Sequence, residues 1–359
     1  MNNTFNIFNV LSVADKELVH SSIIKLLIDE KELNFTKTFL DIDHFSGDSK
    51  LEDVNKSNRK SIRLDVVGFD NSKKTTYKFI IENKFKSTPT INQLKDYDAL
   101  NEINSAKKFL LVFSKDQVPS DVFQYCDENH WQIKSYFNFD LSKKDSLLEL
   151  LQEMPKLKDE KKQYLITEYQ VYLSSIKEDL SFLFKNDEMY NSIKIENYLK
   201  ENNSQSLKLR EFKFRFLLHI QALLSKKITN FVEWKVVTSN DGGSRPIPSV
   251  PFWKENFMVT IDGDSLKIGF SYHHNKAAIA EQLKNILLEK IHDSGIIKNF
   301  SGKQIKNTIK NDKISSVISL VSFDIKKWDT KLKFIDDAAT IFDAYYNIFH
   351  QQQILLNQL

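Results

Sequence analysis

The sequence has 359 residues, which exceeds the size at which one hydrophobic core usually stops growing, so two structural units are expected. Hydrophobic residues make up 41% and charged residues 28%, a balance that excludes a disordered or fibrous chain. The net charge of +3 excludes a globally basic nucleic-acid coat, so any contact with nucleic acid must come from a local patch.

The cysteine count and the N-terminus bear on the location of the protein. A single cysteine, Cys126, excludes an internal disulfide and a cysteine-based zinc cluster. The first residues lack the basic start and long apolar core of a signal peptide, and no run of about 18 apolar residues occurs. We therefore expect a reducing, cytoplasmic location and no membrane insertion.

The first 140 residues alternate between helical and strand-like patterns. Residues 15–40 have apolar side chains at helical spacing with a polar break at 29–32, which predicts two helices, and a polar stretch follows at 46–60. Residues 61–69 and 75–85 are strand-like and are separated by turn residues 70–74, which predicts a β-hairpin. Residues 91–101 and 118–129 are helical, and residues 108–114 and 131–136 are strand-like. This order predicts an α/β (α+β) fold with a mixed sheet flanked by helices.

The rest of the chain begins helical and then changes character. Helical spacing covers residues 147–151, 164–183 and 208–224. Strand patterns at 234–238, 257–261 and 266–272, with Asp262-Gly263-Asp264 as a hairpin turn, and helices at 276–291 and 334–355 predict a C-terminal α+β module. We therefore expect a core over residues 1–140, a helical connection over 141–230 that packs on it, and the module over 231–359.

Two carboxylates lie on the strands of the predicted hairpin. Asp65 stands in the first strand and Glu82 in the second, where both can reach a common face. Carboxylate oxygens are the ligands that hard divalent metals prefer, and such a metal activates water and neutralises charge during phosphodiester hydrolysis. The pair is therefore a candidate metal site.

The second strand adds a cation to this pair. Side chains two apart in a strand point to the same side, so Glu82 and Lys84 share one face while Ile81 and Asn83 share the other. The Lys84 ammonium could position the attacking water or stabilise charge on the phosphate, and the Asn83 backbone carbonyl could add a metal ligand.

At this point the sequence resembles the PD-(D/E)XK nuclease superfamily, and within it the RecB-like family of bacteria and phages. Four segments in order carry the resemblance: Glu17-Leu18-Val19-His20-Ser21 with Leu26-Leu27-Ile28-Asp29, then Arg63-Leu64-Asp65-Val66, Ile81-Glu82-Asn83-Lys84, and Gln93-Leu94-Lys95-Asp96-Tyr97. The resemblance covers roughly the first half of the chain. The family's proline is absent before Asp65, where Leu64 stands.

This resemblance implies a restriction-endonuclease-like fold and a magnesium-dependent nuclease, with Mn²⁺ as a substitute, acting on nucleic acid and most naturally on DNA. It implies a catalytic set of Asp65, Glu82, Lys84, Gln93 and Tyr97, and a metal shell of Asp65, Glu82, Asn83 and Glu17. It also associates the protein with phage defence or mobile elements. A homodimer and a defence-system protein partner both stay open.

Each of these residues also has a plain structural interpretation. A lone Glu-x-Lys on a strand usually means solvated or cross-strand-paired charges. Glu17 fits equally well as a helix-surface acid near an N-terminus, and His20 fits helix packing better than metal binding. Gln93 and Tyr97 lie one helical turn apart on one face, where the Tyr97 ring can also simply pack. We expect Cys126 to be inert and part-buried.

Further candidates in the second half favour surface roles. Residues 240–246 lack the ending of a phosphate-binding loop and indicate a mobile surface loop, and His273-His274 fits a surface pair at a strand end. The lysines of residues 298–313 and Lys326-Lys327 fit solvated faces better than a phosphate-binding site.

The alternative to an enzyme is a catalytically silent nuclease fold that binds nucleic acid or a protein partner. A third alternative is a structural protein whose charges are incidental.

Overall fold

The chain folds into two compact units, seen in a computed structural model. The described residues up to Ser181 form the first unit, and those from Phe182 onward form the second. The helical segment of residues 141–230 is thus divided between the two. The structure describes residues 6–10, 16–57, 60–69, 76–139, 145–185, 187–201, 209–224, 226–228, 231–237, 243–248, 256–262, 264–305 and 315–357.

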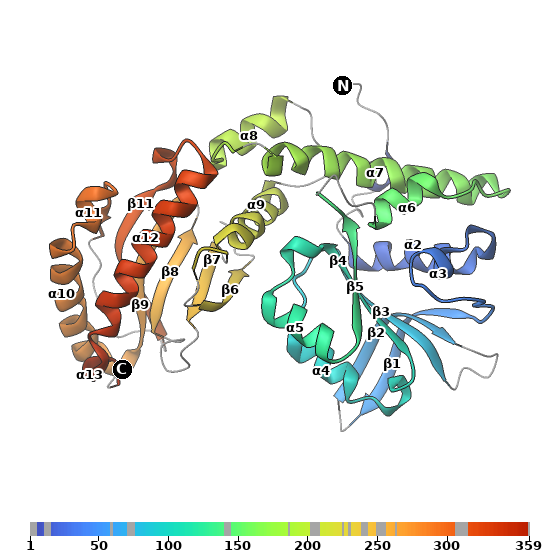
Figure 1. Ribbon diagram of the computed structural model, residues 1–359, viewed down its shortest axis with the longest axis horizontal. Coiled ribbons are helices and arrows are strands. Elements are labelled where there is room, and N and C mark those ends of the chain that lie inside the picture. The colour runs from blue at the N-terminus through green and yellow to red at the C-terminus, as the bar shows by residue number, and fades with distance from the viewer. Residues whose placement is uncertain are drawn as a thin grey trace. The chain divides into compact units, whose positions relative to one another are not determined.

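The first unit is a five-stranded mixed sheet between two layers of helices (Figure 1). The strand order is β1-β2-β3-β4-β5; the first three strands pair antiparallel and the last three pair parallel. Its elements are α1 (Ile7–Val10), α2 (Glu17–Asp29), η1 (Lys31–Leu33), α3 (Phe35–Thr38), β1 (Ser49–Ser57), β2 (Lys60–Phe69), β3 (Tyr77–Lys84), α4 (Ile91–Asp98), η2 (Asn101–Ile103), β4 (Lys107–Ser114), η3 (Lys115–Gln117), α5 (Ser120–Glu128), β5 (Trp131–Phe137), α6 (Leu147–Glu153) and α7 (Glu160–Lys185), which continues into the second unit.

The predicted hairpin is confirmed, and an unexpected strand precedes it. β2 and β3 pair antiparallel from Phe69 and Tyr77 as far as Val66 and Ile81. The turn at residues 70–74 lies outside the described residues. The polar stretch at 46–60 is not simply a loop, because Ser49–Ser57 forms β1 against β2. An edge strand pairs along only one of its two backbone edges, and it therefore tolerates polar side chains. For this reason the hydrophobic pattern did not predict β1.

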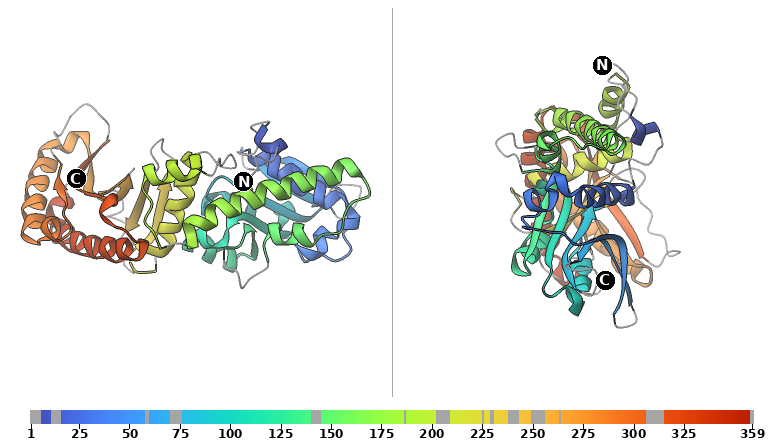
Figure 2. Two further views of the ribbon diagram at one scale, coloured as in Figure 1. Left: turned by 90° about the horizontal axis from the view of Figure 1, so that it is seen from above. Right: turned by 90° about the vertical axis from the view of Figure 1, so that its right-hand side faces the viewer.

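Helices cover the two faces of the sheet differently. α4 and α5 pack on one face, where Leu94, Tyr97 and Cys126 join core residues from β2, β3 and β4. α2 packs on the other face against the first three strands and lies between the sheet and α7 (Figure 2). Cys126 is fully buried rather than part-buried. The end of β3 therefore faces α4 on one side and α2 on the other.

The second unit is a six-stranded antiparallel sheet with helices. The strand order is β10-β11-β9-β8-β7-β6. The segment at residues 240–246, expected to be a mobile loop, is partly strand because Gly243–Pro248 forms β7, and residues 240–242 lie outside the described residues. The elements are α8 (Ser192–Glu201), α9 (Leu209–Leu224), β6 (Phe231–Val237), β7 (Gly243–Pro248), β8 (Phe257–Asp262), β9 (Ser265–His273), η5 (His274–Lys276), α10 (Ala277–Asp293), α11 (Ile296–Asn299), β10 (Lys303–Gln304), β11 (Ser315–Asp324), η6 (Ile325–Lys327), α12 (Lys331–His350) and α13 (Gln353–Leu356).

The core of the second unit lies between its sheet and α12. Phe257 of β8 packs against Phe342, Tyr345 and Phe349 of α12, and the buried Tyr345 hydroxyl donates to the Gly269 carbonyl of β9 at 2.5 Å. Long aromatic side chains on one helix face thus bind the helix to the sheet. Across the described part of the chain, no helix combines the length and apolarity needed to cross a membrane.

Candidate active site

A cleft opens in the first unit at the point where the pairing of β2 with β3 stops. Beyond Val66 and Ile81 the two strands no longer pair, which leaves backbone groups on both edges. Side chains take up two of them: Asp65 Oδ2 accepts a hydrogen bond from the Asn83 backbone N–H at 2.9 Å, and the Tyr97 hydroxyl lies 3.1 Å from the Arg63 carbonyl oxygen. Because backbone groups near a core need partners, these two side chains stabilise the separated edges.

The alternation of β3 decides which side chains enter the cleft. Ile80 belongs to the core beneath α4, so Glu82 and Lys84, two and four residues further on, face α4 as well. Gln93 and Tyr97 lie one turn apart on α4 and point back at Glu82. The predicted facing of Glu82 and Lys84 is therefore seen in the structure.

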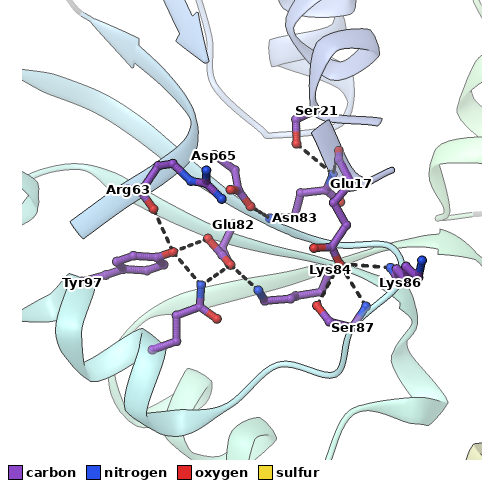
Figure 3. A network of polar contacts seen from close by, with 11 residues as sticks. Glu17, Ser21, Arg63, Asp65, Glu82, Asn83, Lys84, Lys86, Ser87 and Tyr97 are labelled. Carbon is purple, nitrogen blue, oxygen red and sulfur yellow. Dashed lines mark hydrogen bonds and ion pairs between the residues drawn. The ribbon is translucent and has the colours of Figure 1, made fainter. Parts of the chain in front are cut away.

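Glu82 is the centre of a dense hydrogen-bond network (Figure 3). Its side chain is buried, and Gln93 Nε2 donates to Oε1 at 2.6 Å while the Tyr97 hydroxyl contacts Oε2 at 2.6 Å. Lys84 Nζ lies 2.7 Å from Oε1. Gln93 Nε2 also donates to the Tyr97 hydroxyl oxygen at 2.8 Å, so the two α4 side chains hold each other and the carboxylate together.

Burial and a neighbouring carboxylate disfavour the charge on Glu82. Desolvation and the charge of Asp65 raise the pKa of Glu82 to about 7, although Lys84 and Tyr97 oppose the shift. Burial also raises the pKa of Asp65, against the hydrogen bond from Asn83 and the attraction of Lys84. Two buried carboxylates that repel each other gain stability from a shared proton or from a cation.

Lys84 is the cation already present beside this pair. Its side chain is 11% exposed. Burial alone would lower its pKa, but the adjacent Glu82, together with Glu17 and Asp65, raises the pKa above the usual lysine value. Lys84 therefore stays charged at neutral pH.

Glu17, in the first turn of α2, anchors the loop that follows β3. Its Oε1 accepts hydrogen bonds from the Ser87 hydroxyl at 2.8 Å and from the backbone N–H groups of Ser87 and Lys86 at 2.9 and 3.1 Å. Burial raises the pKa of Glu17, yet these hydrogen bonds and the charge of Lys84 outweigh it, so the net shift is downward. Glu17 is therefore an ionised carboxylate at the cleft wall.

Asn83 points away from the cleft, toward α2 and β5. Its Nδ2 donates to the Ser21 hydroxyl at 3.0 Å and to the Glu17 carbonyl at 3.2 Å, and its Oδ1 accepts from the Tyr136 hydroxyl at 2.9 Å. The side chain thus joins the helix and two strands. The expectation that its backbone carbonyl binds a metal stays a prediction.

These residues surround an open cleft of about 270 Å³. Its walls come from β2, β3, α2 and α4, and the lining residues are Glu17, Ser61, Ile62, Arg63, Asp65, Glu82, Lys84, Gln93, Asp96 and Tyr97. One water occupies about 30 Å³ of liquid, so the cleft has room for a hydrated ion and part of a substrate. Six of the seven predicted site residues line it, and Asn83 stands behind it.

The donor set fits a divalent cation in part. A carboxylate offers about four lone-pair positions, of which Asp65 spends one on Asn83 and Glu82 spends three on Gln93, Lys84 and Tyr97. Oxygens of both acids therefore keep positions for a hard ion. No cluster of three or more His, Cys, Asp or Glu side chains suited to a metal occurs among the described residues. A metal here would rest on two carboxylates plus backbone or water oxygens.

Several residues of the site were not found from the sequence. Ser87 and Arg63 contribute a hydroxyl and a carbonyl to the network, and Tyr136 supports Asn83. His20 and Ser21, which belong to the first segment of the family resemblance, lie behind the site: His20 forms a hydrogen bond with Tyr169 at 2.6 Å, and the Ser21 hydroxyl accepts one from Asn83. A serine in a loop or a tyrosine in a strand has no spacing signal, so only the fold reveals these contacts.

The candidates in the second half lie in the second unit. His273 ends β9, is exposed and contacts Asn275, as expected for a surface residue at a strand end. Lys326 and Lys327 lie in η6, and Lys327 Nζ donates to the Ser301 carbonyl at 2.5 Å. Residues 306–313 of the lysine-rich stretch lie outside the described residues.

Comparisons with known proteins agree with the geometry over the first half of the chain. Residues 5–178 match the family model described as the PD-(D/E)XK nuclease superfamily. The matched range contains every residue of the cleft. Neither the curated proteins nor the solved structures contain a significant match to the chain.

Proposed function

We propose that the first unit is a metal-dependent nuclease that hydrolyses phosphodiester bonds in DNA, because residues 5–178 match the model of the PD-(D/E)XK nuclease superfamily. A match to this superfamily implies a nucleic-acid substrate. The observation that supports an active site most directly is the convergence of Asp65, Glu82 and Lys84 on one cleft.

In this proposal Asp65 and Glu82 hold a magnesium ion, which Mn²⁺ can replace. The Asn83 backbone carbonyl would add a further oxygen ligand, and Glu17 would support the ion from the α2 side of the cleft. A bound divalent ion supplies a polarised phosphate and a water that ionises near neutral pH. The raised pKa values of Asp65 and Glu82 support this assignment, because a cation would relieve their repulsion.

Lys84 acts on the substrate rather than on the ion. Its ammonium is charged and has three N–H donors, of which one lies against Glu82. The remaining donors orient the attacking water or hold a non-bridging oxygen of the scissile phosphate, whose negative charge grows during the reaction.

Gln93 and Tyr97 position Glu82 and shape the substrate side of the cleft. Gln93 donates to the Glu82 carboxylate and to the Tyr97 hydroxyl oxygen, and the Tyr97 hydroxyl donates to the same carboxylate, which fixes the rotamer of the acid before a substrate arrives. A carboxylate held in place loses little freedom when it binds an ion, and this preorganisation favours catalysis.

A cleavage assay tests the proposed function. Purified protein is incubated with linear duplex, circular duplex, single-stranded DNA and RNA in Mg²⁺ or Mn²⁺, beside Glu82→Ala and Asp65→Asn variants. We expect metal-dependent cleavage of DNA by the parent and none by either variant, with near-ultraviolet circular dichroism confirming that the variants fold. Cleavage by Glu82→Ala at the parental rate would overturn the assignment of the site.

A catalytically silent nuclease fold is the second candidate. One observation favours it: three donors already hold Glu82, including the Lys84 ammonium. Calorimetry separates the two candidates, because the enzyme requires an Mg²⁺ or Mn²⁺ site that disappears in Asp65→Asn. A parent that binds DNA but no metal would favour the silent fold.

The family resemblance extends the proposal to defence against phages or mobile elements. Plating efficiency of a panel of phages on cells that express the parent or Glu82→Ala tests this role. We expect reduced plating with the parent only. Equal plating on both strains across the panel would count against defence.

A further inference from the structure

We propose that a buried chain of hydrogen bonds, His20 to Tyr169 to Tyr136 to Asn83, positions the end of β3 that carries Glu82 and Lys84. The inference rests on the proposed nuclease function and deepens it, because it adds three positioning residues that do not touch the cleft. We call these four side chains the relay.

The two amide protons of Asn83 determine which of its side-chain atoms donates and which accepts. Nδ2 has two protons, which are spent on the Ser21 hydroxyl and the Glu17 carbonyl. Oδ1 must therefore accept, and the Tyr136 hydroxyl donates to it at 2.9 Å. The backbone N–H of the same residue donates to Asp65. Asn83 thus makes four hydrogen bonds, which tie the catalytic strand to α2, β2 and β5.

The number of hydroxyl protons also determines which residue donates in each hydrogen bond of the relay. A tyrosine hydroxyl has one proton, and that of Tyr136 is spent on Asn83, so in its hydrogen bond with Tyr169 it accepts. The Tyr169 proton is then spent as well. His20 Nδ1, 2.6 Å from the Tyr169 hydroxyl oxygen, must therefore carry a proton and donate. His20 thus donates to Tyr169, Tyr169 donates to Tyr136, and Tyr136 donates to Asn83.

Because the relay is buried, each of its hydrogen bonds is costly to lose. His20, Tyr169, Tyr136 and Asn83 are each fully buried, so a lost partner is not replaced by solvent. The His20 ring also stacks on Phe85, the residue after Lys84, with centroids 3.5 Å apart and planes 19° apart. His20 therefore contacts the chain just beyond Lys84 by ring stacking, in addition to its hydrogen bond within the relay.

The position of Asn83 explains how the relay acts on the reaction. Asn83 lies between Glu82 and Lys84 and points to the opposite face of the sheet, so any rotation of its backbone moves both cleft side chains. Small displacements of catalytic groups lower rates strongly even when the substrate still binds. A weakened relay should thus lower kcat while leaving the KM for DNA nearly unchanged.

The test compares Tyr136→Phe and Tyr169→Phe with a matched control, Tyr345→Phe. The control also removes a fully buried tyrosine hydroxyl and its hydrogen bond, but in the second unit. At saturating Mg²⁺ we expect the two relay variants to lose about tenfold in kcat. We expect their KM to stay within about twofold of the parent, and Tyr345→Phe to keep parental kcat at a comparable loss of thermal stability.

His20 provides a rescue pair. The Nδ2 of an asparagine stands as many bonds from Cα as the Nδ1 of histidine, so His20→Asn keeps a donor for Tyr169 whereas His20→Leu removes it. We expect His20→Asn to retain most of the parental kcat and His20→Leu to lose it. Equal loss in both would mean that ring packing on Phe85, rather than the relay, supports the site.

Hydrogen exchange supplies a readout that does not depend on cleavage. The peptide containing residues 82–84 should exchange faster in Tyr136→Phe and Tyr169→Phe than in the parent or in Tyr345→Phe, because the Asn83 amide loses its fixed position. Parental kcat together with parental exchange in the relay variants would overturn the inference. A parent that cleaves nothing, with faster exchange in those variants, would overturn the proposed function alone.

Discussion

Each of the two units buries a lysine amine, and the two amines are stabilised in opposite ways. Lys84 of the first unit lies 2.7 Å from Glu82 in an open cleft, and its pKa is raised because nearby carboxylates outweigh burial. Lys331 of the second unit donates to the Leu183 and Phe184 carbonyls at the end of α7, at 2.6 and 3.2 Å. Burial lowers the pKa of Lys331 to about 8, although Asp187 opposes the shift.

The difference shows what separates a chemical role from an architectural one. Perturbed pKa values occur both at functional sites and in structural networks. Lys84 faces a cleft and shares it with two carboxylates of raised pKa, whereas Lys331 closes the carbonyl end of a helix inside a core. Loss of Lys84 should therefore affect activity, and loss of Lys331 should affect stability.

The largest expected effect is on catalysis by the first unit. Lys84→Met should lower kcat by about 10²- to 10³-fold, because a preorganised donor to the developing charge is lost. Single-turnover cleavage at saturating Mg²⁺ measures this effect. Lys95→Met, an exposed lysine on α4, is the control and should cut like the parent. A loss of less than threefold in Lys84→Met would remove the contrast between the two lysines.

The next effect is on the stability of the second unit. Lys331→Met should lower the free energy of unfolding by about 1–3 kcal/mol, because a buried carbonyl and a part-buried carbonyl lose their donor. Kcat per folded molecule should not change. Urea unfolding followed by tryptophan fluorescence measures the loss, with the exposed Lys333→Met as control. Equal stability of the two variants would show that the Lys331 hydrogen bonds contribute nothing net.

The pH dependence should have opposite signs in the two units. The Glu82 pKa rises from 4.5 to about 7 on folding, so its contribution to stability is full below pH 4.5 and is lost as the pH rises to about 7. The Lys331 pKa falls from 10.5 to about 8, so its contribution is full above pH 10.5 and is lost as the pH falls to about 8. One group changes stability by at most about 1.4 kcal/mol per pH unit.

Unfolding of Glu82→Gln and Lys331→Met beside the parent, across both pH windows, checks these signs. The difference from the parent should change between pH 4.5 and 7 for the first variant only, and between pH 8 and 10.5 for the second only. Metal affinity of the parent should rise as Glu82 loses its proton near pH 7. Flat differences in both windows would contradict the proposed contrast.

The smallest effects should come from exposed ion pairs, in both units alike. Arg63 contacts Glu52 at 3.1 Å in the first unit, and Lys194 contacts Glu188 at 2.6 Å in the second, with all four side chains well exposed. Glu52→Ala and Glu188→Ala should each change the free energy of unfolding by less than about 1 kcal/mol. Urea unfolding at low and high salt checks this, and a larger loss would place these pairs with the buried lysines.

Much of the first unit could be predicted from its sequence because local patterns and the final contacts agree there. The strands around Asp65 and Glu82, their antiparallel pairing, and the shared face of Glu82 and Lys84 follow from periodicity. The edge strand β1 did not, since its side chains are largely polar.

In the second unit, the strand β11 was not predicted from the sequence, although Ile318, Leu320, Val321 and Phe323 are buried in it. The lysine-rich residues before this strand indicated a solvated face, and their pattern did not predict a strand.

The functions of individual contacts were harder to predict than their positions. Gln93 and Tyr97 were correctly placed on one helix face, but the sequence could not indicate that both contact the Glu82 carboxylate. Tyr136 and Tyr169 gave no signal, because their partners lie more than 50 and nearly 150 residues away along the chain. Hydrogen bonds at that separation depend on the packing of whole elements.

The sequence by itself determined which residues have the chemistry and on which side of their strand or helix they lie, because side-chain alternation and helical spacing are properties of neighbouring residues. Tertiary structure alone decided how far β2 and β3 stay paired, which side chains enter the opening between them, and which buried groups hold that opening in place. These outcomes depend on burial and on partners distant in the chain, and burial also sets the pKa values of Glu82 and Lys331.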